Sequence, residues 1–475
     1  MNMPCCRPGN RAKALAALFL AAVLLTQGCG AITPVPRNLD TLPESIHTAS
    51  PETLNFSLAS PWWEQFNNQE LTRLITHALT HNFSVRQARA RLEQAASLAA
   101  AKKADALPLI TLETRYNRTQ TGQDTTSFNT FSLGPAAAYE VDLWGRINAG
   151  VTSFSLAAGA SASDLETAAM TIAAEVARIW VDLITAREQL ARVKKQLEVH
   201  TTVRDLLELR FQKSMSSALD ILQQREIVAQ TQAKIPPLEN RIQQLEASVH
   251  LLLGQSSGNG LTITGDLPET LPELPGSGLP ANLLALRPDV RAQGLRLMAA
   301  DWDAAAARIY RLPDLVLTGN FLFQDNALDL LLDNWILTLG ARLAGLVFDG
   351  GQKKALSRQA AAVVAERLAA YEEVVYTAIT EVETSLAAEK HQAAHILLLT
   401  EQLETARQAL AEARRRYIKG LDPFIPFLTE QLNVQELEIR LLEQNALLIK
   451  NRITLYRALG GDWQAIVSPM PKETP

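Results

Sequence analysis

The sequence predicts a mainly α-helical protein whose four β-strands contribute to a membrane β-barrel. Three observations predict it: a long internal duplication, extended Ala-rich stretches with helical spacing of apolar residues, and two segments with alternating apolar and polar residues. Small side chains let long helices pack closely. We therefore expect long antiparallel helices in both halves of the chain, with one β-hairpin in each half.

The chain contains two copies of one substructure. Residues 210–254 return as residues 416–460, an offset of 206, and this offset holds back to Gly145 and Gly351 without an insertion. Nearer the N-terminus the offset is 205, so the two copies differ in length by one residue between Pro108 and Gly145. A repeat of this length is not a solenoid unit of about 20 to 50 residues. We therefore expect two equivalent halves of one body.

Composition argues against one class of partner. The formal net charge is -5, and no Lys/Arg run or interleaving of basic with aromatic residues occurs. Binding to nucleic acid depends on a basic surface that faces phosphate groups. We therefore expect no nucleic-acid partner.

The first 28 residues have the pattern of a signal peptide. Arg7, Arg11 and Lys13 precede an apolar stretch of about 12 residues, which is too short to remain as a spanning helix. Gly28 and Cys29 follow as the cleavage point. With Cys5 and Cys6 removed, one cysteine remains in the mature chain, which excludes an internal disulfide.

The rest of the chain divides by composition and periodicity. We expect an N-terminal tether and equatorial segment at residues 29–83 and a first repeat at 84–254. A connector at 255–283 leads to a second repeat at 284–460, and 461–475 form a C-terminal tail.

Each repeat is expected to contain a helix, a hairpin and two long helices. In the first, the helix ends near Ala106, strands cover 109–116 and 127–143, and helices cover about 65 residues to Lys213 and then 218–253. In the second, a helix starts at Arg287, strands cover 315–323 and 335–348, and long helices run to Tyr417 and Leu459. The turns between long helices fall at Ser214 and Gly420.

The strand count determines how the strands can sit in a membrane. Strands of about ten residues can cross a bilayer core when tilted. Open strand edges cannot lie in lipid, because their backbone groups would be unsatisfied. A chain with four spanning strands must therefore close a barrel with other copies of itself. Helices of about 65 residues would reach roughly 100 Å, far beyond one bilayer.

Four motifs carry a resemblance to a known family. They are Tyr-Glu-Val-Asp-Leu-Trp-Gly-Arg-Ile at 139–147, Leu-Arg-Pro-Asp-Val-Arg at 286–291, Val-Phe-Asp-Gly-Gly-Gln at 347–352 and Leu-Tyr-Arg-Ala-Leu-Gly-Gly-Asp-Trp at 455–463. The sequence resembles the TolC-like outer-membrane factors, in particular the lipoprotein branch (NodT-type) that serves RND efflux pumps.

The resemblance implies an architecture and a role. It implies a homotrimer with a 12-stranded β-barrel in the outer membrane and an α-helical barrel in the periplasm. It also implies a periplasmic adaptor and an inner-membrane RND pump as partners, and a conduit for drugs instead of an enzyme, without a cofactor. For Cys29, the Gly-Cys junction is similar to a lipoprotein signal and implies a lipid anchor in the outer membrane; plain signal cleavage remains the alternative.

Other functions remain open or fit less well. A duct for type I protein secretion or for metal ions is an alternative, and a periplasmic coiled-coil scaffold would explain the helices but not the hairpins. The Gly-Gln-Ser-Ser-Gly segment at 254–258 matches a nucleophile elbow but follows a helix. The pairs His77/His81 and His391/His395 have a spacing that can hold a metal, yet no carboxylate or cysteine completes a site, so solvated helix faces are favoured.

Two sets of site residues follow from the resemblance. The adaptor is expected to dock at the two helical turns, at Arg210, Lys213, Ser214, Arg416, Lys419 and Gly420. The family commonly closes its periplasmic end with acidic side chains at positions that are Pro426 and Thr429 here. Asp220, in the first repeat, is therefore the main candidate for the constriction, with Asp422 and Glu430 as others. Support for the start of its own helix is the alternative role of Asp220.

Overall fold

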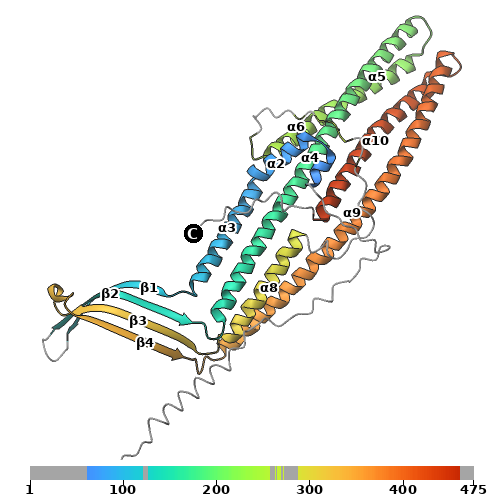
Figure 1. Ribbon diagram of the computed structural model, residues 1–475. Coiled ribbons are helices and arrows are strands. Elements are labelled where there is room, and N and C mark those ends of the chain that lie inside the picture. Colours follow the sequence, from blue (N-terminus) through green and yellow to red (C-terminus); the bar gives the residue numbers. More distant parts are fainter. Residues whose placement is uncertain are drawn as a thin grey trace, which may run out of the picture. The chain divides into compact units, whose positions relative to one another are not determined.

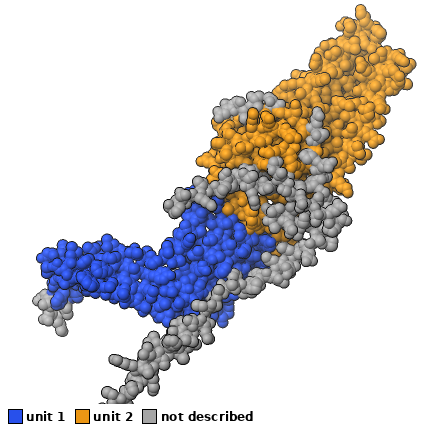
Figure 2. All heavy atoms as spheres, in the orientation of Figure 1, with its two compact units in different colours: residues 1–41, 92–161, 293–371 blue, residues 42–91, 162–292, 372–475 orange. Residues whose placement is uncertain are grey.

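The computed structural model describes residues 61–120, 127–256, 263, 265–268, 271 and 287–460. The signal peptide with Cys29, most of the tether and connector, and the tail lie outside the described residues. The chain forms two compact units (Figure 2). Among the described residues, unit 1 takes its members from 92–161 and 293–371, and unit 2 from 61–91, 162–292 and 372–460. Each unit therefore takes parts from both sequence repeats.

Unit 1 is built around one antiparallel sheet in the order β1-β2-β3-β4 (Figure 1). The strands are β1 Leu109–Gln120, β2 Ser127–Val141, β3 Asp314–Asp325 and β4 Trp335–Ala344. All four predicted strands are confirmed, and the two hairpins pair with each other through β2 and β3. The expected end of the last strand at residue 348 is wrong, because β4 ends at Ala344, next to Gly345, which packs closely against Pro313.

Four helices follow or precede these strands: α3 Phe83–Ala104, α4 Arg146–Gln212, α8 Pro288–Ile309 and α9 Gln352–Ile418. The two long helices, α4 and α9, each have 67 residues, which confirms the predicted length. Aspartates stabilise both starts, since Asp142 accepts backbone N–H bonds from Ile147 and Asn148, and Asp349 accepts them from Gly351 and Lys353. Within unit 1, α8 and α9 share a small apolar cluster that includes Leu297, Ala304 and Val364.

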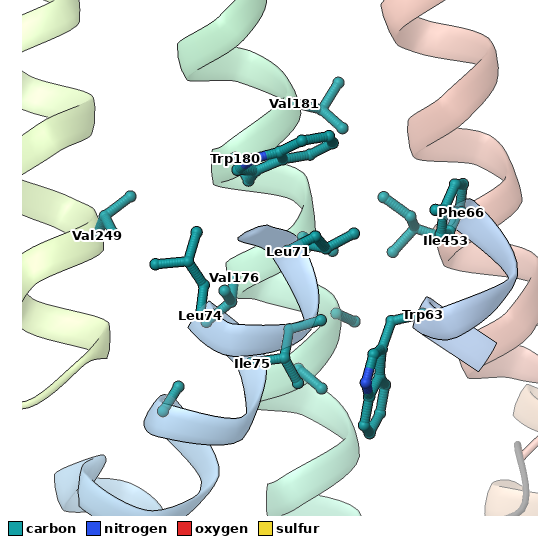
Figure 3. Close-up of a cluster of buried hydrophobic side chains, with 14 of the residues drawn as sticks. Trp63, Phe66, Leu71, Leu74, Ile75, Val176, Trp180, Val181, Val249 and Ile453 are labelled. Carbon is teal, nitrogen blue, oxygen red and sulfur yellow. The ribbon is translucent and has the colours of Figure 1, made fainter. Parts of the chain in front are cut away.

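Unit 2 contains the main apolar core. In this core the first described residues of the chain pack against the long helices (Figure 3). The 3-10 helix η1 Trp62–Phe66 and helix α2 Gln69–His81 contribute to this core. The apolar face of α2, with Leu71, Leu74 and Ile75 among its residues, is buried in this core. The Tyr456 hydroxyl donates to Gln65 at 2.6 Å, which fixes the end of the last helix against η1.

The two repeats differ in their final helices. One helix was expected over 218–253, but the structure has α5 Ala218–Ala233 and α6 Ile235–Leu252, separated at Lys234. Pro236 and Pro237 occupy the first turn of α6, where they lack the N–H groups that would continue α5. In the second repeat Leu442 and Glu443 occupy the equivalent positions, and α10 Phe424–Ala458 continues unbroken. None of the described helices is apolar over a length sufficient to cross a membrane.

Candidate functional site

The two faces of the unit 1 sheet differ in polarity. Apolar and polar residues alternate along the strands, and the register of the strand pairs places the apolar residues of all four strands on the same face. The apolar face carries Ile110, Leu112, Tyr116, Phe131, Leu133, Leu317, Phe321, Phe323, Trp335, Leu337 and Leu339. The opposite face is mainly polar and includes Thr111, Glu113, Arg115, Ser132, Asn320, Thr338 and Arg342. Leu112 and Leu339 are 75% and 77% exposed. A sheet of this kind is suited to apolar surroundings on one face and water on the other.

Aromatic side chains support this register across the strands. The rings of Tyr116 and Phe131 lie 4.8 Å apart between β1 and β2, and those of Phe321 and Trp335 lie 5.7 Å apart between β3 and β4. Such cross-strand pairs stabilise a sheet on one face. Strands β1 and β4 are the two edges of the described sheet, and each presents unpaired backbone groups.

The predicted docking residues lie at two turns with the same backbone geometry. Ser214 and Gly420 have left-handed φ angles of 54° and 71°. In both turns the next residue donates its N–H back into the preceding helix, from Met215 to the Arg210 carbonyl and from Leu421 to the Arg416 carbonyl, both at 2.9 Å. The duplication therefore extends to the hydrogen bonds of the two turns.

The two turns contact each other, and both expose their charged and apolar residues. The Arg210 guanidinium lies over the Tyr417 ring at 5.1 Å, which connects the end of α4 to the end of α9. Lys213 and Lys419 are exposed. So are several large apolar residues, namely Met215, Leu219, Leu222, Ile418, Leu421 and Ile425. Charged and apolar groups of this density are suited to a protein partner.

The three predicted constriction residues have different surroundings. Asp220 forms a capping box, because its carboxylate accepts the Ser217 N–H at 2.9 Å while its own N–H donates to the Ser217 hydroxyl. Asp422 accepts from Arg416 at 2.5 Å, and this hydrogen bond, with the charge of Arg416, lowers the pKa of Asp422. Glu430 lines a groove between α9 and α10, and its carboxylate has no recorded hydrogen bond or ion pair in the described structure.

The Arg-Pro-Asp-Val-Arg motif at 287–291 has a role that sequence reasoning missed. Arg287 is 4% exposed, donates to the Ala458 carbonyl at 3.0 Å, and forms ion pairs with Asp289 and Glu381. Burial alone would raise the pKa of Asp289, but the hydrogen bond and charge of Arg287 lower it. The motif therefore ties the start of α8 to the end of α10 and to α9.

A buried histidine was also missed by the sequence analysis. His200 on α4 is fully buried, its Nε2 lies 2.9 Å from Gln435 Oε1 on α10, and the Gln224 amide donates to its carbonyl at 2.8 Å. Burial lowers the pKa of His200; the hydrogen bond with Gln435 opposes this shift and the charge of Lys234 adds to it. Nothing in the spacing along the sequence distinguishes this residue, since its partners come from other helices.

We expect His200 to make the protein less stable at acidic pH. Because its pKa is lower in the folded chain than in the unfolded chain, the unfolded state binds more protons below about pH 6.5. Stability should therefore fall as the pH drops from about 7.5 to about 5, and His200→Gln should weaken that dependence. Thermal unfolding across this range measures it. His391→Gln, on an exposed stretch of α9, is the control, and equal pH slopes for the two variants would contradict the prediction.

The described structure does not support the two other sites considered from the sequence, a nucleophile elbow and a metal site formed by histidines. Gly254 has a φ of 68° and ends α6 as a left-handed cap, so the described part of the 254–258 segment lacks the strand that precedes a nucleophile elbow. The His77 and His81 rings stack at 4.3 Å. Within the described residues no three metal-binding side chains of the His, Cys, Asp or Glu types come together.

Comparisons with known proteins agree with this geometry. The model of the outer membrane efflux protein family matches residues 74–255 and 279–461. The pyoverdine export outer membrane protein OpmQ of Pseudomonas putida is 29% identical over 415 residues, covering 85% of this chain and 88% of that protein. Outer membrane protein OprJ of Pseudomonas aeruginosa is 27% identical over 472 residues, covering 94% of this chain and 96% of that protein.

Solved structures show the same fold. The structure of the outer-membrane channel OprN has a TM-score of 0.84 at 27% identity and covers 91% of this chain and 99% of that one. The structure of CusC has a TM-score of 0.83 at 22% identity, covers 91% of this chain and 100% of that one, and supports the fold alone.

Proposed function

Because this chain belongs to the outer membrane efflux protein family, we propose that it is the outer-membrane channel of a tripartite efflux system. In this role it exports small molecules such as drugs and works as a conduit without catalysis. The observation that carries the proposal is the sheet of unit 1, whose register places an apolar face and a polar face on the same four strands. Relatives named for the export of pyoverdine, solvents and toluene support this class of cargo.

The channel is a homotrimer. Four strands leave two edges per chain, and lipid cannot satisfy the backbone groups of an open edge. Pairing of β4 with β1 of the next copy removes every edge. Three copies then give twelve strands, with the apolar face toward lipid and the polar face toward the lumen.

The protein resides in the outer membrane and extends into the periplasm. The mature N-terminus carries a lipid on Cys29, which adds to the hold of the barrel without replacing it. Mass spectrometry of the purified N-terminal peptide tests the modification. An unmodified N-terminus at another residue would exclude it.

A periplasmic adaptor, itself bound to an RND-type pump, contacts the turns around Ser214 and Gly420. The test is efflux by variants of Gly420, where an added Cβ would have no heavy atom within 4 Å. Gly420→Trp should abolish efflux while trimer yield and outer-membrane localisation remain, because the bulk lies on the docking surface. Asn tolerates left-handed φ, so Gly420→Asn should retain efflux.

Drug accumulation in intact cells measures the effect of these variants. Parallel loss of trimer and efflux in Gly420→Trp would show that the turn serves folding only. Efflux that survives in a fully assembled Gly420→Trp channel would contradict docking at this turn.

An acidic constriction closes the periplasmic entrance. Asp220, Asp422 and Glu430 remain the candidates, and Glu430 is the most direct to test because the first two also hold their own turns. Three carboxylates near a trimer axis attract divalent cations. Mg²⁺ should therefore block single-channel current in the wild type but not in Glu430→Gln. Equal block in both would move the constriction to Asp220 or Asp422.

A further inference from the structure

Unit 1 contains a pocket of about 940 Å³ where the sheet meets its helices. Its walls come from the ends of α3 and α8, the starts of α4 and α9, and the adjoining parts of β1, β2 and β3. The volume lies within the range of about 300 to 1,000 Å³ that is typical of sites for small organic molecules. The docking turns and the constriction candidates lie elsewhere in the chain, so this pocket belongs to none of the sites described above.

Four of the five strand residues that line the pocket lie on the polar face of the sheet, and Tyr139 is the exception. The four are Leu109, Ala138, Glu140 and Val316. Leu109 pairs with Ala138 and Glu140 pairs with Val316, and each of these positions alternates with a residue of the apolar face. In the proposed channel the polar face is the lumen face, so the pocket is accessible to molecules in transit.

The lining combines apolar walls with a cationic cluster. Ile147, Phe154 and Leu356 supply apolar surface. On one side, the Tyr310 ring lies between two cations, the Arg146 guanidinium at 5.7 Å and the Lys353 ammonium at 4.6 Å from its centroid.

Most of the charges in the lining are already neutralised. Arg146 forms an ion pair with Glu140 at 2.5 Å, and Lys102 forms one with Asp105 at 2.7 Å. Lys353 lies over the aromatic ring and forms no ion pair within 4 Å among the described residues. The nearest acid is Asp349, whose pKa is lowered by backbone N–H bonds from Lys353 and Gly351 and, to a smaller extent, by the charge of Lys353. Asp303, the remaining acid, precedes Tyr310 by seven residues, which is about 10 Å along a helix. Lys353 is therefore the cation available to a ligand.

We propose that this pocket binds amphipathic organic anions, with the apolar body against Phe154 and Leu356 and the negative group at Lys353. The inference rests on the proposed channel function for its lumen-facing position. Binding there would hold such cargo briefly at the point where the helical part of the conduit meets the sheet. Uncharged cargo of the same shape would bind through the apolar walls alone.

The test compares two fluorescent probes on the full-length trimer in lipid nanodiscs. One is 8-anilinonaphthalene-1-sulfonate, and the other is N-phenyl-1-naphthylamine, which has the same aromatic body without the charge. Lys353→Met should weaken binding of the sulfonate about tenfold and leave the neutral amine unchanged, since one charge-assisted contact is lost. Leu356→Asp should weaken both probes.

The neighbouring lysine provides a matched control. Lys354 is exposed on the same helix and does not line the pocket, so Lys354→Met should bind both probes like the wild type. Unchanged sulfonate binding in Lys353→Met, or equal losses in the two lysine variants, would overturn the proposal. Single-channel conductance of the same preparations distinguishes failure of the proposed pocket from failure of the proposed channel function. A conducting wild-type channel that binds neither probe would refute the pocket alone, whereas a non-conducting wild type would refute the proposed function.

Discussion

Replacement of Gly134 by alanine should stop the two hairpins from pairing and remove the assembled channel from the outer membrane. A Cβ at Gly134 would lie 1.9 Å from the Phe321 carbonyl oxygen and 2.9 Å from the Leu322 Cα. These are backbone atoms of β3 and cannot rotate away, so β2 and β3 must separate at the centre of the sheet. Overpacking typically costs about 1 to 3 kcal/mol, and a clash with backbone atoms belongs at the upper end of that range.

A second glycine of the same sheet is the control for this experiment. A Cβ at Gly319 would meet only the Leu339 side chain, at 3.4 Å, which is an ordinary contact. We therefore expect Gly319→Ala to assemble normally. Trimer that resists dissociation in outer-membrane fractions is the measurement. Equal trimer yields for the two variants would show that β2 and β3 do not approach as closely as described.

Much of the fold could be predicted because the relevant signals are local or repeated. Alternation of apolar and polar residues predicted the strands at 109–116 and 335–348, and the constant offset of 206 predicted that α4 and α9 have matching lengths. The position of the turns followed from residues that fit a left-handed cap, clearly for Gly420 and less clearly for Ser214.

Two features that the sequence analysis did not predict have different physical causes. The break between α5 and α6 has a visible signal in Pro236 and Pro237, which the helical periodicity around them obscured. The pairing of β2 with β3 has no comparable signal, because it depends on how Gly134 meets a backbone almost two hundred residues away.

The contacts of the candidate site residues likewise include some that a local sequence pattern indicates and some that it does not. The capping box that holds Asp220 is visible as Ser217 three residues before an acid. The partners of Arg287 and His200 come from distant helices, so only the folded chain reveals them. Residue spacing reports on one helix at a time, whereas these contacts depend on how several helices pack.

The long helices of the second repeat are joined by a buried ion pair whose loss should have the largest effect on stability in unit 2. The side chains of Arg452 on α10 and Glu389 on α9 are 4% and 3% exposed. Arg452 Nε donates to both carboxylate oxygens, at 2.8 and 3.0 Å. Burial alone would lower the pKa of Arg452, but its hydrogen bond with Glu389 raises it, so the guanidinium stays charged.

Glu389→Ala should therefore leave a charge inside the protein without its carboxylate. Removal of one partner from a buried pair costs about 3 to 5 kcal/mol. The first repeat provides the comparison, because Glu246 occupies the position equivalent to Arg452 and pairs with Arg187. That pair is more than one-third exposed, so Glu246→Ala should cost less than about 1 kcal/mol.

Thermal unfolding of the trimer distinguishes an unpaired buried charge from a merely lost contact. If the charge is responsible, Glu389→Leu combined with Arg452→Met should recover most of the stability lost in Glu389→Ala, because two apolar side chains can replace a buried pair. If the double variant is no more stable than Glu389→Ala, the hydrogen-bond geometry between α9 and α10 is what matters. If Glu389→Ala and Glu246→Ala unfold at the same midpoint temperature, burial does not strengthen the pair of Arg452 and Glu389, contrary to the prediction.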